Sequence, residues 1–178
     1  MAQPQRWAVL GTTSADENAI REVEACQHLL VADHLLLFAD SHPRAREAEW
    51  WQALNCGHVA EFVQSGEKIL RLLDLQTDEV LGFLSYDAHG SQVNVYHFVV
   101  RPEHRCQGHG FRLFQALARS LATGGQLQPD GWELRLGVAE KNHRAIAWYE
   151  RLGFRRFGRR ILPLGTASRF GKVAFARM

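Results

Sequence analysis

The chain has 178 residues, of which 46% are apolar and 22% charged, and its formal net charge is +2. This length suits one domain over residues 1–178, and the ordinary composition excludes a disordered or fibrous chain. The small net charge gives no argument for nucleic-acid binding. The three cysteines and nine histidines show no metal-ligand spacing, so we expect no metal site.

The cysteines and the apolar runs also bear on where the protein works. The cysteines form no CxxC pair, which disfavours a disulfide framework and fits a reducing cytoplasm. The opening MAQPQRW lacks the apolar core of a signal peptide, and the longest apolar run, residues 35–39, is far shorter than the roughly 18 residues of a membrane span. We therefore expect a cytoplasmic protein with no membrane partner.

The first quarter of the chain predicts a strand and two helices. Residues 7–10 form a short apolar strand, and Ser14 or Asp16 can cap a helix that continues to about residue 38. A second helix is expected over residues 43–55, because Pro43 suits a first helical turn.

Trp50 and Trp51 lie next to each other on that second helix. Successive helical residues point about 100° apart, so both cannot be central to one apolar stripe. Two interpretations stay open. Both rings cover the edge of the core, or they form an aromatic wall for an acceptor substrate.

The middle of the chain predicts strands. Residues 68–88 show strand periodicity interrupted by a turn at 76–78, which indicates a hairpin. In the next strand Val93 and Val95 alternate with Asn94 and Tyr96. The alternation fails at 98–100, which indicates burial on both faces or a bulge that shifts the register.

This strand leads through the spacing Gly108-x-Gly110 into a helix expected over residues 109–123. Arg112 is expected on its outer side. A strand that enters a helix through a glycine-rich turn directs unpaired backbone N–H groups at one point, which makes an anion-binding site.

The last third of the chain predicts three strands and one helix. The strands are expected at 132–138, from 154 onward and at 172–177, and Asn142 can cap a short helix that ends at Gly153. The strands before and after the long helix should be parallel neighbours, because a helical crossover returns the chain in the same direction.

Two motifs in this half resemble those of the GNAT superfamily of N-acetyltransferases, which use acetyl-CoA. The acyl-CoA motif stands as Val100-Arg101-Pro102 followed by Arg105-Cys106-Gln107-Gly108-His109-Gly110. The second motif, N-x-x-A-x-x-x-Y-x-x-x-G-F, starts at Asn142 and ends at Phe154. Both motifs in the right order are far more specific than two glycines alone.

The resemblance implies an α/β (α+β) fold with a mixed, mostly antiparallel sheet of six to seven strands and about four helices. A parallel, splayed strand pair would hold the cofactor. It also implies direct transfer of an acetyl group from acetyl-CoA to a primary amine in a ternary complex. The acceptor would be a small molecule or a peptide amine, and assembly as a homodimer stays open.

The resemblance assigns the cofactor to the strand end, the loop and the second motif. The loop N–H groups would bind the pyrophosphate, and the strand end would hydrogen-bond the pantetheine arm. The implied cofactor residues are Phe98, Val99, Val100, Arg105, Cys106, Gln107, Gly108, His109, Gly110, Phe111, Asn142, Ala145 and Tyr149.

Tyr149 is the expected general acid, because a phenol of pKa about 10 can protonate a leaving thiolate. The alternative is a core tyrosine on an apolar helix face. Asn142 has two uses as well: it contacts the pantetheine by resemblance, or it only caps a helix.

The base is where the chain departs from the family pattern. Family members often carry Glu or His at the positions of Asn94, Tyr96 or Gly137 here. Three interpretations stay open. His97 is the base, Tyr96 passes the proton through water, or no dedicated base exists. Asn94 remains a candidate substrate residue.

Two other functional classes compete with an enzyme. The missing carboxylate is compatible with an acyl-CoA-binding module with little catalysis. An arginine-rich stretch, residues 151–160, is compatible with RNA binding, but a solvated strand face explains it better, so we expect no nucleic-acid partner.

Overall fold

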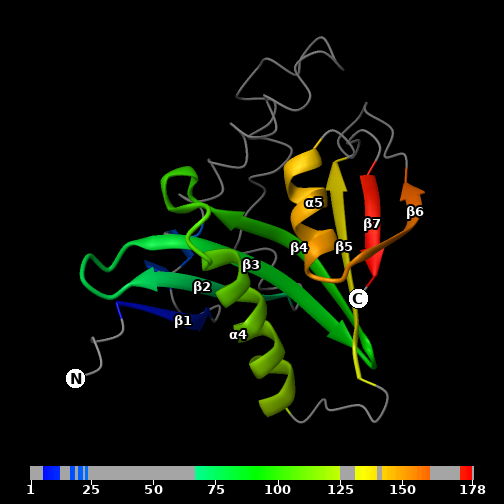
Figure 1. Ribbon diagram of the computed structural model, residues 1–178. Helices are drawn as coiled ribbons and strands as arrows, with labels where there is room; N and C mark the ends of the chain where they lie inside the picture. The colour runs from blue at the N-terminus through cyan, green and yellow to red at the C-terminus, as the bar shows by residue number, and fades with distance from the viewer. Residues whose placement is uncertain are drawn as a thin grey trace, which may run out of the picture.

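The computed structural model of the chain describes residues 6–12, 17, 18, 20, 21, 23, 67–124, 131–139, 142–160 and 173–177. The expected helix over 43–55, with Trp50 and Trp51, lies outside the described residues, as does most of the expected helix before it. Residues 17, 18, 20, 21 and 23 have helical backbone. Two further helices are described, and both follow the sheet strands that position the site (Figure 1).

A seven-stranded sheet forms the centre of the described structure, with strand order β1-β2-β3-β4-β5-β7-β6. Only β4 and β5 are parallel, so the expected mixed, mostly antiparallel sheet is confirmed. The last strand enters between its two predecessors. The strands are β1 (Trp7–Thr12), β2 (Lys68–Asp74), β3 (Val80–His89), β4 (Gln92–Val100), β5 (Glu133–Ala139), β6 (Arg155–Arg160) and β7 (Val173–Arg177).

The helix α4 (His109–Thr123) connects the parallel strands β4 and β5, and α5 (His143–Arg151) follows β5. Leu113, Leu117 and Leu121 recur at helical spacing, and their side chains are buried. Gly124 ends α4 as expected. No helix in the described part of the chain is long and apolar enough to cross a membrane.

Two apolar clusters cover opposite faces of the sheet. Both α4 and α5 pack on one face, in front of the sheet in Figure 1. On that face Leu113 and Tyr149 meet strand residues such as Leu84 and Val95. The second cluster joins the N-terminal helical segment to the other face. It contains Ile20, Val23, Ile69, Leu73, Val80, Phe83 and Val99.

A β-bulge in β4 exchanges the two faces. Ser85 pairs with His97 and the next residue of β3, Tyr86, pairs with Val95, so Tyr96 is the extra residue. Before the bulge Val95 belongs to the helix face, whereas after it Val99 belongs to the opposite face. The expected bulge is therefore present, and it lies at Tyr96, just before the residues at which the sequence pattern breaks.

The parallel strands separate after this bulge. Pairing between β4 and β5 runs from Gln92 and Glu133 to Val95 and Leu136, although both strands continue for several residues. In Figure 1 the upper ends of β4 and β5 diverge, with α5 beside them. The expected splayed pair is thus observed, and among the described residues it leaves the end of β4 without a strand neighbour on the β5 side.

Candidate active site

The loop between β4 and α4 has the backbone of an anion-binding turn. A short 3-10 helix over Pro102–His104 leads to Cys106 and Gly108, which have φ values of 62° and 79°. No side chain caps α4, and its first backbone bond runs from the Arg112 N–H to the Gly108 carbonyl. The N–H groups that precede Arg112 in the first turn therefore remain directed out of the helix start, where a phosphate can bind.

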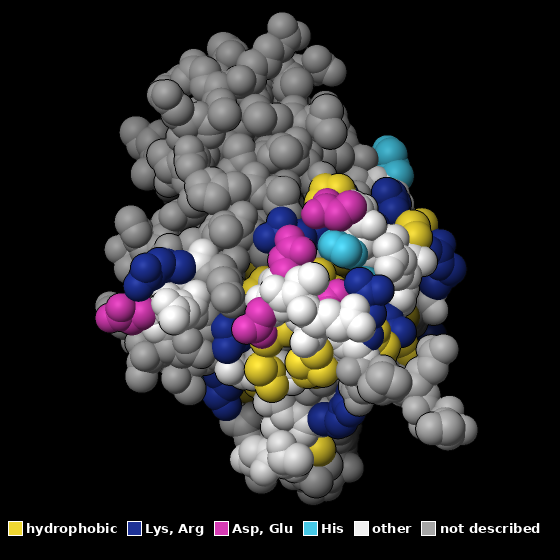
Figure 2. All heavy atoms as spheres, turned by 90° about the vertical axis from the view of Figure 1, so that its left-hand side faces the viewer, with side chains coloured by type: hydrophobic (Ala, Val, Ile, Leu, Met, Phe, Trp, Pro, Cys, Tyr) yellow, Lys and Arg dark blue, Asp and Glu magenta, His cyan; other side chains and the backbone are white. Residues whose placement is uncertain are grey.

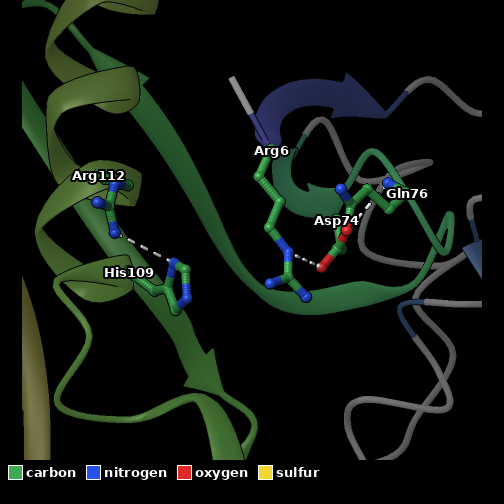
Figure 3. A network of polar contacts seen from close by, with 5 residues as sticks. All are labelled: Arg6, Asp74, Gln76, His109 and Arg112. Atoms are coloured by element: carbon green, nitrogen blue, oxygen red, sulfur yellow. Dashed lines mark hydrogen bonds and ion pairs between the residues drawn. The ribbon is translucent and has the colours of Figure 1, made fainter. Parts of the chain in front are cut away.

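Arg112 supports this loop from the first turn of α4. Its Nη1 donates to the Gln107 carbonyl at 2.7 Å, and its guanidinium lies 3.6 Å from the centre of the Trp7 ring. It also lies 3.3 Å from the Nδ1 of His109 (Figure 3). Arg112 lies off the buried leucine face of α4, as expected, and its side chain is half-buried between the loop and β1.

His109 is buried at the start of α4, with its ring edge-on to the rings of Trp7 and His104. Burial lowers the pKa of His109, and the positive charge of Arg112 lowers it further. The imidazole is therefore neutral near pH 7, and it contributes packing rather than charge to the loop between β4 and α4. We call this loop, residues 101–108, the phosphate loop, because it is the expected site of the pyrophosphate.

A second polar network in Figure 3 fixes the turn between β2 and β3. Asp74 accepts hydrogen bonds from the Gln76 N–H at 2.8 Å and from the Nε of Arg6 at 3.0 Å. The Gln76 bond lowers the pKa of Asp74 most, and Arg6 adds to the effect. This network ties Arg6, the residue before β1, to the turn that follows β2.

Gly110 is needed for packing against α5. A Cβ on Gly110 would lie 3.1 Å from the Trp148 ring and 3.2 Å from Phe98. Trp148 stacks on Phe98 with ring centres 5.4 Å apart and contacts Phe114 at 5.7 Å. The two glycines of the motif therefore differ in use, since Gly108 supplies the left-handed backbone and Gly110 admits an aromatic ring.

Tyr149 lies at the inner side of this aromatic cluster. Its ring is 6.4 Å from Phe98 and 5.5 Å from Phe154, and the residue is 8% exposed. Burial raises the pKa of Tyr149 well above its usual range, so the phenol stays protonated. The described residues give its hydroxyl no hydrogen bond.

The end of β4 offers backbone groups to the gap between the parallel strands. The Arg101 N–H bonds to the Leu81 carbonyl on β3, so by strand alternation the N–H groups of Phe98 and Val100 face the other way. The Val100 carbonyl also faces away from β3 and accepts from the Nε of Arg105 at 2.9 Å. Arg105 thus ties the loop to the strand end.

Asn142 is a helix N-cap, because its Oδ1 accepts a hydrogen bond from the Ala145 N–H at 3.1 Å. The capping role is confirmed, and the cofactor contact stays a prediction. The next residues link α5 to the phosphate loop, since the Nη2 of Arg144 lies 3.0 Å from the Sγ of Cys106. Cys106 is an exposed free thiol at the loop.

The candidate base residues lie on the opposite face of the sheet. The bulge places Tyr96 and His97 on the same face, although strict alternation would separate them. The Tyr96 hydroxyl donates to Asp87 at 2.5 Å, and the Nδ2 of Asn94 donates to the same carboxylate at 2.9 Å. Burial, then the bond to Asp87, raises the pKa of Tyr96 to about 12.

His97 pairs with Ser85 across the bulge, and its Nδ1 lies 2.9 Å from the Ser85 Oγ. Behind Ser85 lies Glu67, a residue that the motifs do not single out. Burial raises the pKa of Glu67, and hydrogen bonding to Ser85 partly offsets this rise. The only indication of Glu67 is in the strand pairing, which places the start of β2 beside Ser85 of β3, and Ser85 in turn faces the bulge in β4.

The molecular surface near the phosphate loop carries mixed charge. In Figure 2, basic, acidic and histidine side chains of the described residues alternate without one dominant sign. Charges of both signs also pair here, since the carboxylates of Glu79 and Glu103 lie 3.3 and 3.9 Å from the guanidinium of Arg101. Among the described residues, no group of three or more His, Cys, Asp or Glu side chains is arranged to hold a metal ion.

Solved structures with the same fold include several acetyltransferases. The PaiA N-acetyltransferase of Thermoplasma acidophilum, solved with coenzyme A, is 12% identical, with a TM-score of 0.65 over 98% of this chain and 100% of that one. The spermidine N-acetyltransferase of Vibrio cholerae, solved with CoA and spermine, is 16% identical, with a TM-score of 0.60 over 97% and 95%. Nourseothricin acetyltransferase is 27% identical, with a TM-score of 0.53 over 63% and 64%.

Comparison with protein families gives the more specific result. No curated protein matches the chain. The family model described as "Acetyltransferase (GNAT) domain" matches residues 66–156, a span that contains both motifs and half of the chain. The protein therefore belongs to the GNAT family of acetyltransferases and is an acyltransferase.

Proposed function

We propose that the protein transfers an acetyl group from acetyl-CoA to a primary amine, by direct attack of the amine in a ternary complex. The observation that carries this proposal is the separation of β4 and β5 after Val95 and Leu136. Two further features support the proposal: the uncapped start of α4, whose unpaired N–H groups suit an anion, and Tyr149, which burial keeps protonated. These are the parts that a CoA thioester requires.

The loop and the strand end would hold the cofactor. The N–H groups of His109, Gly110 and Phe111 at the start of α4 would bind the pyrophosphate, where the helix dipole favours negative charge. The N–H groups of Phe98 and Val100 would bond the pantetheine arm as a neighbouring strand would. Acetyl-CoA would supply the activated thioester.

Two groups of the chain would then assist the transfer. A β4 N–H at Phe98 or Val100 would stabilise negative charge on the thioester oxygen. Tyr149 would donate its proton to the departing sulfur, because burial keeps the phenol protonated and the described residues leave its hydroxyl available. Cys106 lies in the phosphate loop, where its sulfur accepts a hydrogen bond from Arg144, and it would form no covalent intermediate.

The acceptor would be an amine, and a panel of amines tested as substrates would identify it. The spermidine N-acetyltransferase neighbour makes spermidine a reasonable first probe, beside alkyl amines and peptides with free α-amino groups. Release of the CoA thiol and gain of one acetyl group on the amine, followed by mass spectrometry, would establish the reaction. CoA binding without thiol release for any amine would overturn it.

The first mutational test is Tyr149→Phe. We expect turnover to fall about 100-fold, which is the lower range for loss of a general acid, with the Kd for CoA nearly unchanged. Tyr86→Phe is the matched control, since Tyr86 is also buried but bonds to Ser120 on α4 at 2.9 Å. Equal turnover in the two variants would remove the acid role of Tyr149.

A further inference from the structure

A chain of three polar side chains crosses the sheet on the face opposite α4. It runs from Glu67 to Ser85 on β3 and on to His97 on β4. The pairing register explains the alignment, because Ile69, Ser85 and His97 occupy one row across β2, β3 and β4. Glu67 stands two residues before Ile69 on the same face, so its carboxylate reaches Ser85 diagonally.

Hydrogen-bond chemistry fixes the direction of this chain. A carboxylate only accepts, so the Ser85 hydroxyl donates its proton to Glu67. The Ser85 oxygen must then accept at its 2.9 Å contact with His97, which requires a proton on Nδ1 of the neutral ring. The lone pair of that tautomer is on Nε2.

Glu67 shows two properties of a base rather than of a structural ion pair. Its Oε2 is buried and has no hydrogen-bond partner among the described residues, which is a costly arrangement in a folded protein. Burial and the charge of Asp87 both bring its pKa closer to neutrality. Other polar groups on this face are Asp87, Asn94, Tyr96 and, further along β2, Arg71.

We propose that Glu67 is the general base of the acetyl transfer and takes the proton of the acceptor ammonium through His97 and Ser85. The ammonium gives one proton to His97 Nε2, His97 Nδ1 gives one to Ser85, and Ser85 gives one to Glu67. The neutral amine nitrogen attacks the thioester carbon, and the C–S bond breaks as the C–N bond forms. Tyr149 gives its proton to the leaving thiolate, and the second proton, which the nitrogen loses on becoming an amide, restores the phenol of Tyr149. This inference rests on the proposed function.

The bulge explains how the base on one face serves a thioester held from the other face. His97 directly follows the extra residue Tyr96, and Phe98 directly follows His97. His97 therefore borders the gap between β4 and β5 while its ring lies on the Glu67 face. Adjacent residues of one strand thus present the proton relay and the cofactor-binding backbone.

The test compares Glu67→Gln with Glu17→Gln, which removes an exposed carboxylate paired with Arg21. With spermidine, or the best amine of the survey, we expect Glu67→Gln to lose about 100-fold or more in kcat at pH 7, with unchanged CoA affinity. The loss should shrink as the pH approaches the pKa of the amine, because free amine then forms without a base. Ser85→Ala should show the same trend more weakly.

A second readout is independent of turnover. The ¹⁵N shifts of His97, assigned with His97→Gln, should show the Nδ1–H tautomer in the wild type. Wild-type turnover by Glu67→Gln, a loss that does not change with pH, or an Nε2–H tautomer would overturn the relay and leave the proposed function intact. Absence of thiol release by the wild type with every amine would overturn both.

Discussion

At the scale of single residues, two tyrosines of the site differ in what their hydroxyl groups contact. Burial raises the pKa of both Tyr149 and Tyr96, and Asp87 adds to the rise at Tyr96. Tyr96 already donates to the Asp87 carboxylate. Tyr149 makes no such bond within the described residues, so it is the phenol that can donate to a leaving group.

The bond between Tyr96 and Asp87 predicts a pH-dependent stability. Burial acts to raise the pKa of Asp87, but the bonds from Tyr96 and Asn94 outweigh it and lower the pKa overall. A lowered carboxyl pKa stabilises the fold above the unfolded-state value, and this contribution is lost as the pH falls through the folded value. Tyr96→Phe should therefore cost about 1 kcal/mol at pH 7, a value reduced because Tyr96 is 50% exposed.

Urea unfolding at pH 7 and pH 3 measures this effect. The cost of Tyr96→Phe should diminish toward low pH, as Asp87 becomes protonated. Tyr86→Phe removes a bond between two neutral hydroxyls, so its cost should be similar at both values. A pH-independent cost for Tyr96→Phe would contradict the assignment.

The sequence motifs identified those site residues that stand at a fixed spacing from other residues of the same motif. Gly108, Asn142 and Tyr149 stand at fixed spacings, and the structure places each at the expected turn, cap or buried helix face. Glu67 gave no such signal, because it contacts Ser85 only through strand pairing. The contact of Arg112 with Trp7 gave no signal for a similar reason, since Trp7 comes from a strand that is distant in the sequence.

At the scale of elements, the close approach of β3 and β4 fixes the end of β4. Gly82 pairs with Val100, and a Cβ on Gly82 would lie 2.4 Å from the Val99 carbonyl oxygen. The atoms that this Cβ would meet belong to the backbone of β4, so no side-chain movement relieves the contact. The position of the Phe98 and Val100 amides thus depends on a glycine in the neighbouring strand.

Gly82→Ala should therefore lower the free energy of unfolding by about 2 kcal/mol, because the strands must move apart. The KM for acetyl-CoA should rise, since the strand end that would hold the cofactor is displaced. Gly11→Ala on β1 is the control, because a Cβ there meets nothing within 4 Å, and its effect should stay within about 0.5 kcal/mol. Denaturant unfolding and steady-state kinetics test both, and equal effects of the two changes would contradict this account.

Element prediction succeeded where periodicity and end signals agreed. The helix expected over 109–123 matches α4, and the failed alternation after Tyr96 marks a true bulge. The strand order was harder to predict. The sequence shows that β6 and β7 exist, but the placement of β7 between β5 and β6 depends on long-range pairing.

At the scale of the whole molecule, the two faces of the sheet carry different parts of the candidate site. The helix face holds the phosphate loop, the aromatic cluster and Tyr149, whereas the opposite face holds Glu67, Ser85 and His97. The two faces are connected at the bulge at Tyr96 and at the gap after Val95, where residues of β4 change from one face to the other. In the proposed reaction, an amine would approach from the Glu67 face while the cofactor is held from the helix face.

This separation predicts where bound CoA protects the chain from hydrogen exchange. CoA at 100 times its Kd should add about 2.7 kcal/mol to the free energy of unfolding, because it binds the folded state only. Local protection should concentrate on the amides of Phe98 and Val100 and on residues 109–111, whose N–H groups precede the first bond of α4. Amides of β2 near Glu67 should gain only the global increase, since they already bond within the sheet on the acceptor side.

Gly108→Ala provides the contrast for this experiment. Its φ of 79° disfavours any residue with a Cβ, so the turn should distort at a cost of about 1 kcal/mol. Protection of the first turn of α4 by CoA should then weaken. Protection that instead appears at β2 and Ser85, with no change at the start of α4, would place the cofactor on the opposite face and contradict the division of the sheet into a cofactor side and an acceptor side.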